Sequence, residues 1–305
     1  MAAKKAARNK SARKKAAKKE GLPGPGIHLN IPDGIYHSWP HAVSQSTLKT
    51  VRALTPAHAR DNLLHPKEQT DAMAFGEALH LAALEPDEFG NRVVRGLGVT
   101  RQSAANKELW KLFEEQNKGK LIISESKYLK LEAMSEALRS HRLASSLLYM
   151  PGHREASVLW EDEETGLLCK GRYDLIGRWR DMNVIADVKT TDCDLSDDAL
   201  KRTIGNFGYD VQAAYYLDGA NVLAAADRHF LLIFVTKKPP HHIRVIEPTE
   251  NALFQGRTKY RKALRTWAKC VKEDNFPGFP EVVTQLDLMR WDELSDHELD
   301  EEIGR

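Results

Sequence analysis

Three charged residues stand where the sequence otherwise predicts buried strands. The stretch GRYDLIGRWRDMNVIADVKTTD, residues 171–192, holds Asp174 in its first apolar run and both Asp187 and Lys189 in its second. Burying an unpaired charge is costly, so these side chains are expected to pair, to bind a ligand or to take part in a reaction.

The spacing of the three residues predicts that they meet. Side chains alternate along a strand, so Asp187 and Lys189 project from the same face. If the chain turns back near residues 178–183, Asp174 lies roughly opposite Asp187 on the neighbouring strand. Two carboxylates this close repel each other unless a cation lies between them, and hard oxygen ligands suit Mg²⁺ or Mn²⁺.

Lys189 cannot bind a metal, but its ammonium group can orient a water molecule, help to deprotonate it, and stabilise charge on a phosphate. An ordinary ion pair between Asp187 and Lys189 on a half-exposed strand explains the same pattern. The spacing alone does not distinguish the catalytic from the structural explanation.

The surrounding pattern predicts helices first and a sheet afterwards. From Ser44 to about residue 147 the periodicity is helical, with helix starts at Ser44 and Pro56, a helix over DAMAFGEALHLAAL that EPDEF breaks, and helices over 104–117 and 125–147. Strands are predicted over EASVLW, LLCKGRYDLIGR and MNVIADVKTT, the last two as a hairpin. Helices over 194–204 and 209–226, strands over 229–236 and 242–247, and a helix over 250–273 complete the pattern. This order indicates a single α/β domain with a mixed central sheet flanked by helices.

The composition limits the class of protein. Hydrophobic residues make up 42% and charged residues 29% of 305 residues, as in globular proteins that live in water. The longest strongly apolar run, residues 230–235, is too short to cross a membrane, and no signal peptide is recognisable, so a cytoplasmic protein without membrane contact is expected. Three widely spaced cysteines exclude a disulfide framework and a four-cysteine metal cluster.

Charge is distributed unevenly along the chain. Residues 1–20 carry a local charge of +8, so the rest of the chain carries −6. We predict a disordered basic tail and linker over residues 1–26, one domain over 27–280 with a helical part to about 150 and a sheet core over 151–280, and an acidic tail over 281–305. The basic tail is either a non-specific tether for nucleic acid or a solubilising extension, and composition leaves both open.

Four segments in order resemble a known nuclease family. GRYD followed after one hairpin by DVKT resembles the core motif of the PD-(D/E)xK nuclease superfamily, with Asp187 at a position where glutamate is more frequent. Together with VSQSTLKTVRALTPAHAR, FGEALHLAALEPDEF and the QAAYY helix, which span about residues 35–275, it resembles the RecE-like exodeoxyribonuclease group, the C-terminal nuclease domain of exonuclease VIII of prophages. The resemblance implies a restriction-endonuclease-like core.

The resemblance also implies roles for individual residues. Asp174, Asp187 and the carbonyl group of Val188 would bind the metal, and Lys189 would be the catalytic lysine. His80, on the helix of a GxxxH pattern, would reach the metal site. Without the resemblance, His80 on its apolar-rich helix is more simply explained as a core histidine.

Four further residues are assigned less directly. Glu155 matches an additional acidic position in related nucleases, although several nearby acids have an ordinary surface explanation. Gln212 and Tyr216 stand four residues apart on a helix and share a face, and in similar nucleases such a helix contacts DNA. Arg172 shares the strand of Asp174, where a phosphate contact and a simple surface charge are both open.

The function implied is hydrolysis of DNA by a Mg²⁺-dependent exonuclease, with Mn²⁺ as a substitute. The resemblance predicts digestion of linear duplex ends from 5′ to 3′, leaving 3′ overhangs for a RecT-like single-strand annealing recombinase, by a ring-shaped homo-oligomer. A RecB-like or CRISPR-associated nuclease with another polarity or with endonuclease activity is an alternative. A non-catalytic DNA-binding protein is a second, and the presence of Asp174, Asp187 and Lys189 argues against it.

Overall fold

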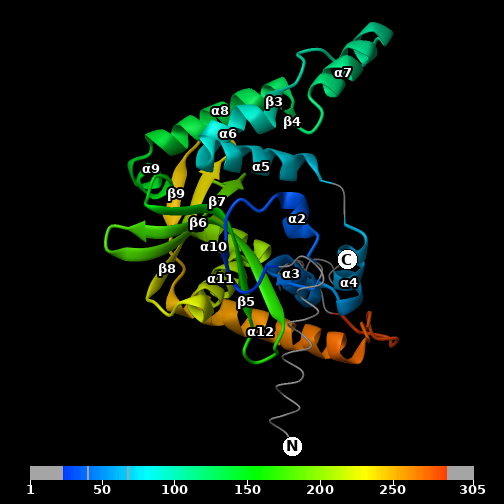
Figure 1. Ribbon diagram of the computed structural model, residues 1–305, viewed down its shortest axis with the longest axis vertical. Coiled ribbons are helices and arrows are strands. Elements are labelled where there is room, and N and C mark those ends of the chain that lie inside the picture. Colours follow the sequence, from blue (N-terminus) through cyan, green and yellow to red (C-terminus); the bar gives the residue numbers. More distant parts are fainter. Residues whose placement is uncertain (1–22, 40, 67–68, 287–305) are drawn as a thin grey trace, which may run out of the picture.

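The computed structural model describes residues 23–39, 41–66 and 69–286 (Figure 1). Most of the predicted basic tail over residues 1–26 and of the predicted acidic tail over 281–305 lies outside these ranges. The helices are α2 (Asp33–His37), α3 (Gln45–Ala53), α4 (Pro56–Leu64), α5 (Asp71–Leu84), α6 (Pro86–Arg92), α7 (Ala104–Gln116), α8 (Glu125–Ser140), α9 (Arg142–Leu148), α10 (Asp197–Phe207), α11 (Tyr209–Leu223) and α12 (Glu250–Glu273). Among them, none combines the length and the apolar character that crossing a membrane requires.

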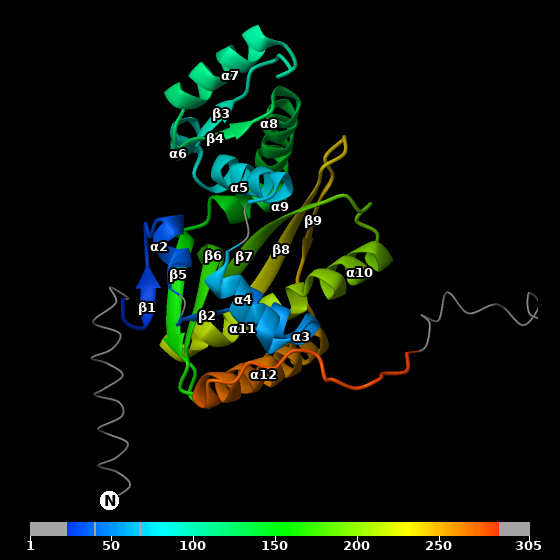
Figure 2. The same cartoon turned by 90° about the vertical axis from the view of Figure 1, so that its right-hand side faces the viewer.

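The long strands form one mixed sheet in the order β1, β5, β6, β7, β8, β9, and β2 joins it beside β6 (Figure 2). The strands of this sheet are β1 (Gly26–His28), β2 (Val43–Ser44), β5 (Gly152–Glu161), β6 (Leu168–Trp179), β7 (Met182–Thr191), β8 (Arg228–Thr236) and β9 (Ile243–Ile246). Strands β5, β6 and β7 run antiparallel, β7 and β8 run parallel, and β2 runs parallel to β6. The predicted hairpin is therefore the centre of the sheet.

Helices cover both faces of this sheet. Along β8, Leu232 and Phe234 pack into a core with α3, α11 and α12, whereas Ile233 and Val235 pack into a second core with α5, α8 and α9. The same alternation on β7 buries both of its faces, which explains why VIADVK reads as a nearly continuous apolar run. The predicted fold class, a mixed sheet flanked by helices with a helical N-terminal part, is confirmed.

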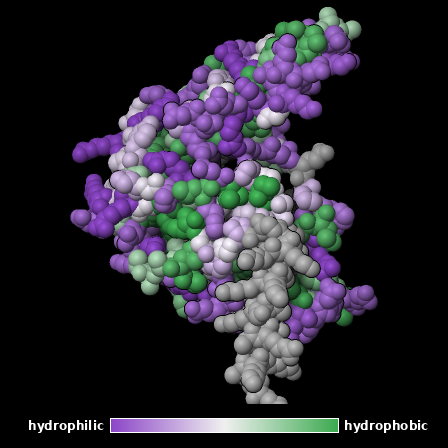
Figure 3. All heavy atoms as spheres, viewed as in Figure 1, coloured by the Kyte–Doolittle hydropathy of each residue, from purple (hydrophilic) through white to green (hydrophobic). Residues whose placement is uncertain are grey.

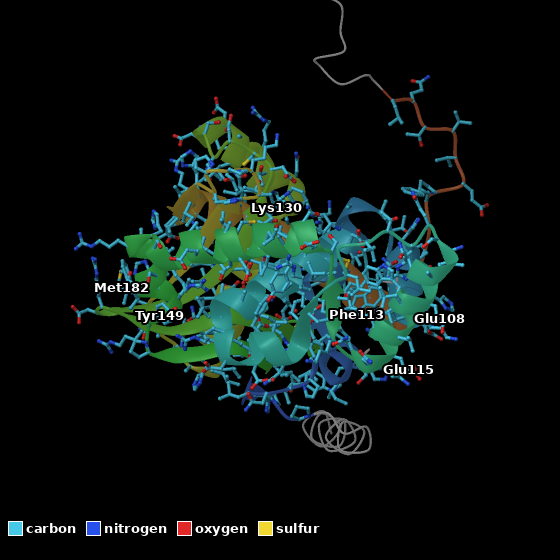
Figure 4. All side chains as sticks on the ribbon, turned by 90° about the horizontal axis from the view of Figure 1, so that it is seen from above. Glu108, Phe113, Glu115, Lys130, Tyr149 and Met182 are labelled. Atoms are coloured by element: carbon cyan, nitrogen blue, oxygen red, sulfur yellow. The ribbon has the colours of Figure 1, made fainter. Side chains whose placement is uncertain are left out.

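A small unit projects from one end of the molecule. Strands β3 (Val93–Arg95) and β4 (Leu121–Ile123) pair in parallel beside α6, and α7 connects them. Helix α7 buries only Trp110, while Leu109 and Leu112 are about half exposed, and apolar spheres gather over this helix in Figure 3. Seen from above, α7 lies at the opposite end of the molecule from Tyr149 and Met182 (Figure 4). Helix α7 is thus remote from the end of the β6–β7 hairpin, whereas Val93 of β3 and Ile123 of β4 pack into the second core of the sheet.

The structure corrects two details of the predicted helices. The helix expected over residues 125–147 is divided at His141, whose Nδ1 accepts a hydrogen bond from the backbone N–H of Ala144 at 3.2 Å and so caps α9. After the predicted break at EPDEF, Pro86 begins the short helix α6, because proline is well tolerated in a first helical turn. Neither β1 nor β2 was predicted, since two or three residues show no periodicity.

Candidate metal centre

The sheet opens between β6 and β7 at the position of the predicted site. Strand β6 pairs with β2 at Cys169 and Lys170 and with β7 only from Leu175 onward, so the intervening residues of β6 face no strand on that side within the described chain. Continuing the register beyond the Leu175–Ala186 pair places Asp174 opposite Asp187, as the hairpin predicted. The opening leaves backbone groups of β7 to be satisfied by side chains.

Two local distortions turn carboxylates toward this opening. Tyr173 packs into the core on one face of the sheet and Leu175 into the core on the other, so the alternation of β6 changes phase at Asp174. Opposite it on β5, Glu155 has a left-handed backbone with φ of 47°. Such a conformation costs energy in a residue with a side chain and is concentrated at functional sites. The irregular backbone of β6 and β5 therefore directs the side chains of Asp174 and Glu155 toward the opening.

His80 reaches the opening from α5. Its Nε2 lies 2.9 Å from the carbonyl oxygen of Val188 and 3.6 Å from Asp174 Oδ2, and its Nδ1 lies 3.7 Å from Glu155 Oε1. One ligand atom each of His80, Glu155 and Asp174 lies within 4.8 Å of the others. Burial alone would lower the pKa of His80, but the charges of Asp174 and Glu155 outweigh it and raise the pKa to about 10.

Asp174 also holds the backbone of β7. Its Oδ2 accepts a hydrogen bond of 2.8 Å from the N–H of Val188, while the carbonyl of the same residue faces His80. Burial and the neighbouring charge of Asp187 raise the pKa of the Asp174 carboxyl. This carboxyl group therefore sits where an added positive charge would be strongly stabilising.

Asp187 is held from two sides at the floor of the site. It is 1% exposed, and Gln212 of α11 donates a hydrogen bond of 2.6 Å from Nε2 to its Oδ1. Lys189 Nζ lies 2.5 Å from Oδ2, but this oxygen has no hydrogen-bond partner of good geometry. Burial would lower the pKa of Lys189, whereas the charge of Asp187 raises it, and the net direction is upward. Asp187 and Lys189 do form an ion pair. The strand that carries them is buried and not half exposed, so the pair is not an ordinary surface ion pair.

The donor set matches a hard divalent cation. A carboxylate oxygen of Glu155, one of Asp174 and an imidazole nitrogen of His80 lie within 4.8 Å of one another, and the Val188 carbonyl adjoins His80. Asp187 lies outside this group, but its charge acts on both Asp174 and His80. Hard oxygen donors in partial number are those that Mg²⁺ and Mn²⁺ take. The buried Oδ2 of Asp187, which has Lys189 as an ion-pair partner but no hydrogen bond of good geometry, is a polar atom that a bound cation would also satisfy. The residues present therefore fit the cation that the sequence predicted.

Tyr216 takes a different place from the one expected. Its ring stacks on Tyr173 with centroids 4.3 Å apart and planes 18° apart, and the residue is 8% exposed. A Cβ atom at Gly171 would lie 2.9 Å from the Tyr216 ring, so this stack explains the glycine of GRYD. The tyrosine supports the site from below, and its predicted contact with DNA stays a prediction.

Arg172 is occupied by protein partners. Its guanidinium pairs with Asp33 and donates a hydrogen bond of 2.9 Å to the carbonyl of Ile31. The neighbouring Lys170 is buried and donates to the carbonyl of Tyr36 at 2.8 Å, and burial lowers its pKa to about 8. Both cations fasten the segment around α2 to the sheet. A phosphate contact by Arg172 stays a prediction that none of these interactions supports.

One residue beside Lys189, Tyr209, was not among those predicted from the sequence. Lys189 Nζ lies 4.8 Å from the ring centroid of Tyr209, the first residue of α11. The signal was present in the sequence as FGY, two aromatic residues flanking Gly208 just before the QAAYY segment. Tyr209 carries no charge, so a search for charged residues does not find it.

Comparison with known proteins agrees with this arrangement. The family described as PDDEXK-like domain of unknown function (DUF3799) matches residues 44–287. A crystal structure of a proposed exonuclease from Eubacterium rectale is similar with a TM-score of 0.55 and 15% identity, covering 87% of this chain and 98% of that chain. A phage-related exonuclease from Haemophilus somnus 129PT is 15% identical over 77% of this chain and 96% of that chain, with a TM-score of 0.32. None of the curated proteins matches the sequence significantly.

These comparisons extend to most of the chain. The family match includes β6, β7, α11 and α12, and so contains Asp174, Asp187, Lys189 and Gln212 in the positions described. At such low identity, the likeness to the Eubacterium rectale protein concerns the fold. The predicted superfamily is confirmed by the family match over residues 44–287. The chain belongs to the PDDEXK-like domain family.

Proposed function

We propose that this protein is a Mg²⁺-dependent exonuclease that digests linear double-stranded DNA. The observation that carries the proposal is the convergence of His80, Glu155 and Asp174 at the opening of the sheet, next to the buried Asp187 and its half-buried partner Lys189. Three acids and one histidine at this density have no role in packing, because unpaired buried charge destabilises a fold.

The cation would be held by His80, Glu155, Asp174 and Asp187 with the carbonyl of Val188. When bound, it would supply a Lewis acid for the scissile phosphate and lower the pKa of the attacking water. Partial coverage by protein ligands suits this use, since Mg²⁺ usually keeps several positions for water and substrate phosphate.

The chain's own residues then divide the work of orientation and charge. Lys189 places its ammonium group at the floor of the site, where it orients the attacking water and stabilises the negative charge that grows on the phosphate. Gln212 fixes the direction of the Asp187 carboxylate, and Asp174 fixes the β7 backbone at Val188. Rotamers locked in this way reduce the reorganisation that reaction requires.

Polarity, product and partners follow from the resemblance to the RecE-like group. We propose digestion from the 5′ end, which leaves a 3′ overhang, and delivery of this overhang to a RecT-like annealing recombinase. We also propose a ring of several copies that encloses the duplex. Enclosure would keep the chain on DNA although the sequence after residue 20 carries a net charge of −6.

The experiment is digestion of linear duplexes labelled at either the 5′ or the 3′ end, with a covalently closed circle alongside, by the purified protein and Mg²⁺. The proposal predicts that the 5′ label is lost first and that the circle survives. Nicking or linearisation of the circle would mean that the same site acts as an endonuclease and not as an exonuclease. Intact substrates of every kind, with any divalent cation, would reject catalysis altogether.

A further inference from the structure

An exposed aromatic step adjoins the catalytic lysine. Phe207 ends α10 and Tyr209 begins α11, and their rings stack with centroids 5.6 Å and planes 15° apart. Gly208 between them has a left-handed backbone with φ of 69°, which lets two helices meet in so short a turn. Tyr209 lies against Lys189, whereas Phe207 is 54% exposed. The exposed Phe207 ring is therefore connected to Lys189 through the ring of Tyr209.

Helix α3 places two cations beside the same step. Lys49 Nζ lies 5.6 Å from the centroid of the Phe207 ring. A guanidinium nitrogen of Arg52 lies 3.5 Å from the position of a Cβ atom built on Gly208. Figure 2 shows α3 beside α10 and α11, and contacts between α3 and α11 agree. Residues far apart in the chain thus bring rings and cations together.

These two cations have no carboxylate partner among the described residues. In the described part of the chain, neither Lys49 nor Arg52 makes an ion pair or a side-chain hydrogen bond. Two other cations near α10 do have carboxylate partners, since Lys201 pairs with Asp198 and Arg244 pairs with Asp197. Burial together with the charge of the neighbouring Arg52 lowers the pKa of Lys49. The surface beside the step is therefore positive and unneutralised.

We propose that Phe207, Lys49 and Arg52 form a subsite for an unpaired segment of the DNA strand adjoining the scissile phosphate. A base stacks on the exposed Phe207 ring, and the two cations bind backbone phosphates. Every base has an aromatic face, so such a platform accepts any sequence. This inference rests on the proposed function and adds to it that the strand reaches the site unpaired.

An ordinary structural role for Phe207 accounts for less. A phenylalanine that merely closed the end of α10 would bury its ring, whereas more than half of this one is exposed. The nearby cations would also be expected to find carboxylates, as others in this protein do. Aromatic rings interleaved with unpaired cations are the features of single-strand binding surfaces.

The test is the affinity of the full-length protein for a short labelled oligo(dT), with an abasic strand of equal length that keeps the phosphates but lacks bases. Anisotropy is measured in EDTA, so that no cleavage occurs. Phe207→Ala should weaken oligo(dT) binding about ten-fold and leave abasic binding unchanged. Phe207→Trp should keep or tighten oligo(dT) binding, which excludes misfolding as the cause.

Charge is tested separately. The double substitution Lys49→Ala with Arg52→Ala should weaken binding of both strands and reduce the slope of log K against log salt by about 1.4, as expected for two lost phosphate contacts on a single strand. Matched controls are Phe254→Ala, an exposed phenylalanine of α12, and Lys130→Ala, an exposed lysine of α8 labelled in Figure 4. Both controls should bind as the wild type does.

Three results would overturn the subsite: oligo(dT) affinity within two-fold of wild type in Phe207→Ala, equal losses for oligo(dT) and the abasic strand, or an equal loss in Phe254→Ala. The binding assay contains no metal, so its failure leaves the nuclease proposal standing. Conversely, a protein that cleaves no DNA but loses oligo(dT) binding in Phe207→Ala keeps the subsite and rejects the nuclease.

Discussion

At the scale of single residues, Lys189 has two roles that measurement can separate. We propose that its ammonium group stabilises reaction charge, and it also neutralises Asp187, which is 1% exposed and, among the described residues, is otherwise held by Gln212 alone. Sequence alone predicts that substituting this lysine leaves the fold intact. The burial of its partner revises that expectation, because removing one member of a buried pair leaves an uncompensated charge.

Lys189→Ala should therefore lower the cleavage rate by at least about 100-fold, the typical contribution of a positioned proton-transfer group. In EDTA it should also lower the thermal midpoint, and Mn²⁺ should restore part of this loss by neutralising Asp187. Cleavage assays and thermal scans with and without Mn²⁺ measure both effects, with Lys130→Ala as the matched control. Near-normal cleavage by the variant would reject the assignment of the lysine.

Glu155 is the acid whose role sequence supported least. Its place beside His80 and its left-handed backbone argue for a function, so Glu155→Gln should weaken Mn²⁺ binding about ten-fold in calorimetry. Glu161→Gln is the matched control, since this exposed acid ends the same strand. If the two variants bind Mn²⁺ equally well, Glu155 is not part of the cation site.

At the scale of elements, the site depends on how closely α11 lies against its neighbours. Helix α11 carries Gln212, and α12 packs against its outer side through a bidentate pair of Arg257 with Asp218, both hydrogen bonds being 2.8 Å long. A Cβ atom at Gly256 would lie 2.2 Å from the backbone oxygen of Asp210. Only glycine permits this separation of the two helices.

Gly256→Ala should accordingly destabilise the protein by about 2 kcal/mol, as overpacking against backbone does, because one helix must move. The shift should also lower cleavage, since Gln212 would move with α11. Gly205→Ala is the control, because a Cβ atom there meets nothing within 4 Å, and alanine should stabilise that exposed helix by up to about 1 kcal/mol. Denaturant unfolding of both variants gives the comparison, and equal stabilities would contradict the close packing.

Sequence predicted those elements whose pattern is long and local. The hairpin of β6 and β7 and the helices α5, α11 and α12 follow from periodicity, so Asp174 and Asp187 could be placed opposite each other in advance. The place of His80 near them was implied only by the resemblance to a nuclease family. The left-handed backbone of Glu155 and the pairing of β2 with β6 depend on tertiary contacts with no local signal. The same holds for Arg172, whose partner Asp33 lies 139 residues away in sequence. Charge alone could not show that this arginine was already engaged.

At the scale of the whole molecule, charge and connectivity decide how DNA is held. The first 20 residues carry +8 and the rest of the chain −6, so long-range attraction comes mainly from the N-terminal residues. The first strand begins at Gly26, and β1 pairs with β5, so a deletion meant to test these charges should stop before it. A deletion of residues 1–22 leaves every described strand in place.

Deleting residues 1–22 should weaken DNA binding at low salt and reduce the salt dependence of binding, because many phosphate contacts are lost. The single-turnover cleavage rate at saturating DNA should stay close to that of the full chain, since no residue of the site is removed. Titrations at several salt concentrations and rapid-quench kinetics measure the two quantities. A rate loss that persists at saturation would make the N-terminal residues part of the active site.

The central claim is that the cluster around Asp187 is the centre of a cation-dependent nuclease. The most direct test is the release of nucleotides from linear duplex DNA by wild type and Asp187→Asn, each with Mg²⁺ and with EDTA. Asparagine keeps the size of the side chain and can still bond to Gln212, so the fold should survive while the ligand charge is lost. Of these four conditions, we predict that only the wild type with Mg²⁺ releases nucleotides. Release by Asp187→Asn at a comparable rate, or by the wild type in EDTA, would contradict the claim.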